Sequence, residues 1–293
     1  MKIKVVFFLF LVSCSIEIKE PNEHISWKKK RNDALFAKDG YLNIAGIFPI
    51  QNGKYSMGSN SNNDIKLPED MPNNLAQVTV KDSLIYFEYN ESVILNDSIK
   101  TRNFSYNYYK NKSSFSLRSY IWFVHIDSGS KVIRLRNLKH PLLSLNLDID
   151  FYKYSKELVL EGRYEKYNEP KILGFSNILG DSYLDTIPGI IYFKYNGKKF
   201  SLEPTISSSG DFFVAFSDLT NGKKTYSGGR YLYVSPEDKQ SKVTIDFNKS
   251  LNPPCVFSTF TTCPLPRKEN NLKILIEAGE KNYNGIVYSS VYQ

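Results

Sequence analysis

Short runs of alternating apolar and polar residues dominate this sequence, and turn residues separate them. The clearest run is GIIYFKYNGKKFSLEP, residues 189–204, in which Asn196-Gly197 is a residue pair preferred for two-residue hairpin turns with positive φ. Residues 119–136 show the same pattern around Asp127-Ser128-Gly129. A period of two places every second side chain on one face of a sheet. These runs therefore predict antiparallel hairpins.

Similar signals cover most of the chain, so we expect a mainly β fold. Aromatic residues make up 14% of the sequence, and residues of this kind favour half-buried strands. Strands at this density predict an antiparallel β-sandwich or barrel-type architecture, built as one unit or as two stacked β units. The further expected strands are residues 76–80, 83–89, 92–100, 157–167, 211–219, 230–234, 242–247 and 272–278, with another hairpin at 47–59 around Asn52-Gly53.

One short helix is expected near the N-terminus, within SWKKKRNDALFAKDG, residues 26–40. Ser26 is a suitable N-cap, and Asp39-Gly40 is a suitable stop. Trp27 and Leu35 would contribute to its apolar side.

The first fifteen residues, MKIKVVFFLFLVSCS, have the pattern of an export signal. Lys2 and Lys4 form a charged start, and Val5–Val12 form an apolar core of eight residues. Eight helical residues span only about 12 Å, too short for a bilayer core. Leu11-Val12-Ser13-Cys14 is similar to a bacterial lipobox, in which the cysteine is acylated. A signal peptide with a chance cysteine is the alternative.

The chain is therefore expected to be lipid-anchored in a bacterial cell envelope, facing the periplasm or the cell surface. Multiple acyl chains on Cys14 would hold it durably on a membrane. We divide it into a signal peptide at 1–13, a lipidated tether at 14–25, a helix plus β unit at 26–138, and a C-terminal β unit at 139–293.

The net charge of +8 does not indicate a nucleic-acid partner. Removal of Lys2 and Lys4 with the signal peptide leaves +6 (8 − 2), and the remaining basic residues are scattered. The single basic run, residues 28–31, is either a solvated helix face or a surface attracted to anionic lipid head groups.

Two cysteines remain for the folded part, Cys255 and Cys263. They can form a disulfide in an exported protein, or they remain as two buried free thiols. Their spacing and the lack of a nearby histidine argue against zinc, so no metal is expected. No cofactor motif is found either, and His24, His125 and His140 have no catalytic context.

The C-terminal third concentrates ionisable and amide residues around a rigid loop. Alternation along residues 242–248 places Asp246 and Asn248 on one face. The prolines that follow cannot donate ladder hydrogen bonds, so they predict a stiff loop that crosses a sheet edge or a barrel mouth. Arg230 would pair with Asp246 or Glu277, or hold an anionic group of a ligand. The candidate ligand-binding residues are Tyr226, Arg230, Asp246, Asn248, Asn252, Asn270, Glu277 and Glu280.

Three functions fit these residues. The first is a membrane-tethered module that binds a small polar or anionic molecule in a C-terminal polar pocket. The second is a hydrolase with Asp246 or Glu277 as acid or base and Arg230 as the anion stabiliser. The third is a structural or assembly lipoprotein with an envelope protein as its partner. The reaction, if there is one, does not follow from the sequence.

Several segments resemble the bacterial family called domain of unknown function 1684. The resemblance is carried by residues 26–59, by FSDLTNGKKTYSGGRYLYV (216–234) and by TIDFNKSLNPPCVFSTFTTCPLPRKENNLKILIEAGEK (244–281). It spans nearly the whole expected mature chain, although SLNPPCVF stands where relatives show AYNPPCAF. The resemblance supports the fold and the location of the site, and it implies no particular reaction.

Overall fold

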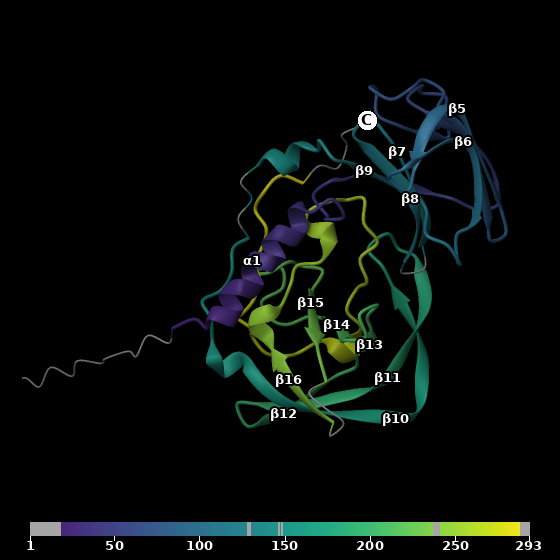
Figure 1. Cartoon of the computed structure of the whole chain (residues 1–293). Helices are drawn as coiled ribbons and strands as arrows, with labels where there is room; N and C mark the ends of the chain where they lie inside the picture. Colours follow the sequence, from purple (N-terminus) through teal and green to yellow (C-terminus); the bar gives the residue numbers. More distant parts are fainter. Residues whose placement is uncertain (1–18, 128–129, 146, 148, 237–240, 288–293) are drawn as a thin grey trace, which may run out of the picture.

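The computed structural model describes residues 19–127, 130–145, 147, 149–236 and 241–287. Strands make up 48% of the structure and helices 12%, which confirms the mainly β class (Figure 1). The expected signal peptide, Cys14 and the first part of the expected tether lie outside the described residues.

The first sheet is a nearly closed, barrel-like structure. Its strand order is β1-β9-β8-β7-β5-β4-β2-β3, and β6 pairs with β5. All of these pairs are antiparallel except the short pair β2–β3. The strands are β1 (Ile44–Pro49), β2 (Gly53–Gly58), β3 (Ile65–Lys66), β4 (Ala76–Lys81), β5 (Leu84–Leu95), β6 (Ile99–Asn107), β7 (Ser114–Leu117), β8 (Tyr120–Asp127) and β9 (Ser130–Asn137).

An aromatic cluster fills the core of this sheet. Trp122, fully buried on β8, donates through its indole Nε1 to the Tyr89 hydroxyl at 3.0 Å. Phe115 lies next to Phe87, with ring centroids 4.7 Å apart. Burial of these rings removes a large apolar area from water and stabilises the barrel-like unit.

The C-terminal part contains a four-stranded and a three-stranded sheet that share one core. Strand order in the larger sheet is β12-β11-β10-β16, and in the smaller sheet β13-β14-β15. The strands are β10 (Val159–Ser176), β11 (Ser182–Tyr195), β12 (Lys198–Leu202), β13 (Thr205–Ile206), β14 (Phe212–Phe216), β15 (Arg230–Val234) and β16 (Lys242–Asp246). The 3-10 turns in the described part of the chain are η1 (Pro141–Ser144), η2 (Lys156–Leu158), η3 (Phe247–Lys249), η4 (Pro254–Val256) and η5 (Lys268–Asn270).

Two of the predicted hairpins are confirmed. Strands β11 and β12 pair across Asn196 and Gly197, which have φ of 48° and 72°, the left-handed conformation that this turn requires. Strands β8 and β9 pair from Tyr120↔Asn137 to Asp127↔Ser130.

The predicted hairpin at 47–59 is wrong. Strand β1 pairs with β9, and β2 pairs with β4, so the two strands flanking Asn52-Gly53 are not partners. The turn is held instead by the Tyr55 hydroxyl, which bonds to the backbone N–H and carbonyl of Gln51 at 2.9 and 3.1 Å. The turn residues therefore predicted the change of chain direction, but not which strands pair with each other.

The predicted strand at 272–278 is also wrong, because this segment makes no strand ladder. Its burial still alternates: Leu272 and Ile276 are 3% and 0% exposed, whereas Leu275 is 55% exposed. Backbone carbonyls of the segment bond instead to the backbone N–H of Leu219 and to the guanidinium of Arg230. A period of two thus marked a half-buried extended segment, not a strand.

Helix α1 (Asn22–Phe36) begins before the predicted N-cap. Its N-cap is Pro21, which makes no side-chain cap bond, so Ser26 lies inside the helix. Leu35 packs with Val256 and Phe257 in a small cluster between the helix and the C-terminal loops. Figure 1 shows the helix lying across the C-terminal part of the chain. Among the described residues, no helix has the length and apolar character needed to cross a membrane.

We predict that Gly189→Ala destabilises the fold, whereas Gly174→Ala in the same hairpin does not. A Cβ on Gly189 would lie 2.3 Å from the Glu165 carbonyl oxygen, while a Cβ on Gly174 meets nothing within 4 Å. Overpacking of this kind costs about 1–3 kcal/mol. Urea unfolding of both variants checks the expectation, and equal stabilities for the two would contradict it.

Candidate functional site

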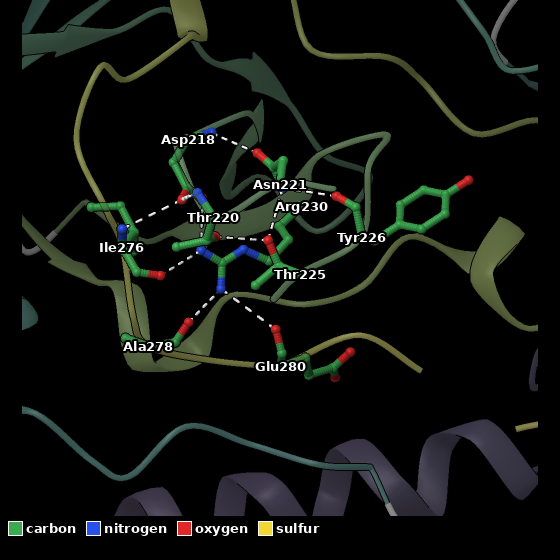
Figure 2. Close-up of polar contacts among 9 residues, drawn as sticks. All are labelled: Asp218, Thr220, Asn221, Thr225, Tyr226, Arg230, Ile276, Ala278 and Glu280. Carbon is green, nitrogen blue, oxygen red and sulfur yellow. Dashed lines mark hydrogen bonds and ion pairs between the residues drawn. The ribbon is translucent and has the colours of Figure 1, made fainter. Parts of the chain in front are cut away.

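Arg230, the first residue of β15, lies at the centre of a buried polar network (Figure 2). Its guanidinium forms an ion pair with Asp218 at 2.8 Å, and both side chains are 0% exposed. It also donates to the carbonyl oxygens of Ile276 at 2.8 Å, Ala278 and Glu280. Its expected partners were Asp246 or Glu277, so that pairing is wrong, and the arginine braces the fold.

The loop before β15 fixes the position of the Asp218 carboxylate. Its Oδ1 accepts from the Thr220 N–H at 2.8 Å, and the Asn221 amide oxygen accepts from the Asp218 N–H at 2.6 Å. The hydroxyls of Thr220 and Thr225 bond to each other at 2.7 Å. Burial lowers the pKa of Arg230, and the neighbouring Asp218 opposes this shift.

Glu280 links the end of this network to helix α1. Its carboxylate is 0% exposed and pairs with Arg31 at 2.7 Å. The second oxygen accepts from the backbone N–H of Asn252, also at 2.7 Å. The Asn252 amide donates to the Lys281 carbonyl at 2.7 Å, while its Oδ1 is buried and has no hydrogen-bond partner among the described residues.

Asp246 and Asn248 lie together, although not on one strand. Strand β16 ends at Asp246, whose carboxylate accepts from the Asn248 N–H at 3.1 Å and caps η3. The Asn248 amide also exchanges hydrogen bonds with the backbone of Ser155 at 2.8 and 2.9 Å. The His24 ring of α1 lies 3.1 Å from the Asn248 carbonyl oxygen. The contacts of Asn248 with Ser155 and His24 join separate segments of the chain.

Two further candidates, Asn270 and Glu277, differ sharply in environment. Asn270 is buried and exchanges hydrogen bonds with the backbone of Glu203 at 2.8 and 3.0 Å. Glu277 is exposed. The predicted residues therefore divide among several places, and they do not gather in one hollow.

Tyr226, the last of the candidates, lies in a cluster with Cys255 and Cys263. Both cysteines are free thiols, and no disulfide joins them in the structure. The Cys255 N–H donates to the Cys263 sulfur at 2.9 Å, and the Cys255 sulfur lies 3.7 Å from the Tyr226 hydroxyl. The hydrogen bond with Cys263 lowers the pKa of Cys255, whereas burial raises that of Cys263.

A groove of about 930 Å³ lies beside the proline- and cysteine-rich loop, residues 252–266. Its walls come from this loop, from β10 and β11, from the smaller sheet, and from β8 and β9 of the first sheet. Figure 1 shows the β10–β11 hairpin running along one side of the C-terminal part, toward the first sheet. Asn252, Cys263 and Asn270 line the groove, whereas the other sequence-predicted residues do not.

Aromatic rings and an arginine that the sequence analysis missed form part of the groove wall. Phe175 and Tyr183 stack across the β10–β11 pair with ring centroids 5.6 Å apart. The guanidinium of Arg267 lies 5.3 Å from the centre of the Phe175 ring. Its Nε and Nη2 bond to Glu269, while Nη1 is buried without a hydrogen-bond partner among the described residues. In the sequence, the feature that could have pointed to Arg267 is its position directly after Pro266, at the end of the rigid loop.

Comparison with known proteins gives a family match. Residues 147–281 match the family described as "Protein of unknown function (DUF1684)", which confirms the resemblance over that range. The N-terminal stretch quoted for it, residues 26–59, lies outside the matched range. A solution NMR structure of an uncharacterised protein of Haloarcula marismortui is 25% identical, with a TM-score of 0.39, and covers 45% of this chain and 75% of that one. No curated protein matches the chain.

We predict that Asp218→Asn lowers the free energy of unfolding by about 3–5 kcal/mol, because it leaves the Arg230 charge buried without its counter-ion. Glu161→Gln is the matched control, since Glu161 pairs with Lys242 while 74% exposed, and exposed pairs contribute about 0–1 kcal/mol. Chemical denaturation measures both. A loss at Asp218 no larger than that at Glu161 would contradict the bracing role.

Proposed function

We propose that this chain, whose residues 147–281 match DUF1684, is an exported lipoprotein that binds a small ligand in the groove. Its ligand carries an anionic group and a flat apolar part. The observation that carries the proposal is the groove itself, about 930 Å³ in volume and lined by both rings and charges. Volumes of roughly 300–1,000 Å³ are typical of small-molecule sites.

Arg267 supports an anionic group on the ligand. Its guanidinium lies over the Phe175 ring, and its Nη1 has no hydrogen-bond partner among the described residues after Glu269 is bonded. Guanidinium groups recognise carboxylate and phosphate through paired N–H donors. Arg31 and Arg134 also line the groove. Its acidic lining residues are Asp185 and Glu203.

The rings of Phe213, Tyr231 and Tyr233 on the smaller sheet support the apolar part. Phe213 lies 4.9 Å from Tyr231 and 5.3 Å from Tyr233, measured between ring centroids. Tyr233 is 48% exposed, so its ring offers a surface that a flat ligand would cover.

The loop wall is held in place before any ligand arrives. Asn252 is fixed through its backbone N–H by Glu280 and through its side chain by Lys281, as described above. The Tyr231 hydroxyl donates to the Pro264 carbonyl at 2.9 Å and ties the loop to β15. A preorganised wall loses less entropy on binding. The hydrolase alternative has no comparable support, because Asp246 and Glu277 do not line this groove.

The groove is tested with the aromatic anion 1-anilinonaphthalene-8-sulfonate and two arginine variants. We expect saturable fluorescence that Arg267→Gln weakens by about tenfold, since a hydrogen bond to a charged group contributes about 1.5–3 kcal/mol. Arg163→Gln is the control, because Arg163 is 75% exposed and does not line the groove. Thermal unfolding verifies that both variants are folded. Equal affinity of the three proteins, or no saturable binding, would overturn the groove as a ligand site.

The anchor is tested separately, by growth with radiolabelled palmitate in a bacterial host. We expect label on the wild-type chain and on Cys255→Ser, and none on Cys14→Ser, because only Cys14 follows the apolar segment. Label that persists on Cys14→Ser, or an unlabelled wild type, would refute the lipoprotein assignment and leave the groove unaffected.

A further inference from the structure

A second cavity, distinct from the groove, lies between the start of helix α1 and the chain segment that precedes η2. Its volume is about 1040 Å³. Figure 1 shows this segment running beside the helix. Ring contacts join the two: Trp27 packs edge-on against Phe151 at 6.0 Å, and His24 lies 5.1 Å from Tyr154.

The cavity wall is strongly basic. Four lysines line it, against the single carboxylate of Glu20, which gives a formal charge of +3 (4 − 1) at neutral pH. They come from two separate segments, so the fold brings the charges together. The four are Lys19, Lys28, Lys29 and Lys153.

Two of the four lysines form ion pairs with carboxylates of the chain. Lys28 pairs with Glu20 at 2.7 Å, and Lys29 pairs with Asp33 at 2.6 Å. The Lys29–Asp33 pair is largely exposed, at 76% and 59%, so it contributes little and exchanges readily for another anion. Like charges held at one cavity raise the local concentration of anions.

A neutral amide and the apolar side chains of Ile149 and Phe151 complete the wall. Asn32 contributes the neutral amide. Lys28 lies 5.6 Å from the centre of the Phe151 ring, which leaves an apolar surface beside the charge.

We propose that this cavity is a binding site for a phosphate ester. Several lysines suit the oxygens of a phosphate, since ammonium groups bind phosphate as point charges. The volume exceeds what a bare phosphate needs. The side chains of Ile149 and Phe151 offer an apolar surface for an organic substituent. Two sources supply this chemistry: a soluble phosphomonoester, or the head group of an anionic phospholipid. The lipid source is within reach under the anchoring proposal, because Lys19 follows Cys14 by five residue steps, at most about 18 Å of extended chain.

The test uses the full chain in a neutral detergent and the fluorescence of Trp27, which packs against the cavity wall. The second tryptophan, Trp122, is fully buried in the first sheet and gives a constant background. Inorganic phosphate and glycerol 3-phosphate probe the soluble source. For the lipid source, the chain is reconstituted in phosphatidylcholine vesicles with and without one quarter phosphatidylglycerol, about 25 mol%.

We expect a saturable change with the soluble phosphates, a difference between the two vesicle types, or both, and the pattern identifies the source. The double variant Lys29→Gln/Lys153→Gln weakens the response by about tenfold, because charge-assisted bonds are lost. The double variant Lys66→Gln/Lys194→Gln removes the same charge from exposed positions outside the cavity and leaves the response unchanged. No response to any probe, or equal weakening by both double variants, would overturn the site.

Discussion

The fully buried ion pair between Asp218 and Arg230 is the interaction on which the C-terminal architecture depends. A buried guanidinium requires a counter-ion and acceptors for its remaining donors. Asp218 supplies the first, and the carbonyl oxygens of Ile276, Ala278 and Glu280 supply acceptors for Nη1 and Nη2, while Nε is buried without a hydrogen-bond partner among the described residues. Within the described part of the chain, the segment 276–280 has only an isolated bridge, between Glu280 and Phe151, in place of a strand ladder, and the arginine adds the bonds that hold its other carbonyl oxygens. If the segment detached, the Arg230 guanidinium would lose these acceptors, and a buried charge without acceptors is costly.

This fixed segment then positions two other parts of the molecule. Its last residue, Glu280, binds Arg31 of helix α1 and the backbone of Asn252 at the start of the proline- and cysteine-rich loop. The loop in turn forms one wall of the groove, and the helix forms one wall of the lysine-rich cavity. Both proposed sites therefore rest on a scaffold set by buried charges. The candidate residues of the sequence analysis are mostly part of that scaffold.

The sequence predicted what local patterns encode. The turn at Asn196-Gly197 and the strands β14, β15 and β16 follow from period-two alternation and from the conformations that turn residues allow. Partner choice was not predictable in the same way. Arg31 and Glu280 are 249 residues apart in sequence, and Asp218 reaches Arg230 from a loop. Residues 272–278 had the alternation of a strand, but the Ile276 and Ala278 carbonyl oxygens bind the Arg230 side chain and that of Ile274 binds the Leu219 N–H. The groove lies where three sheets meet, so no single segment of the sequence predicts it.

Native-state hydrogen exchange tests the scaffold most directly. The amides of Tyr231 and Leu251 bond to each other's carbonyl oxygens at 2.8 Å, and the amide of Glu280 bonds to the Ser250 carbonyl at 2.9 Å. If the buried pair joins β15, the loop and the terminal segment into one cooperative unit, all three amides exchange only through global unfolding, with one shared free energy. Exchange of the Glu280 amide through a local opening, well below the free energy of global unfolding, would contradict that view.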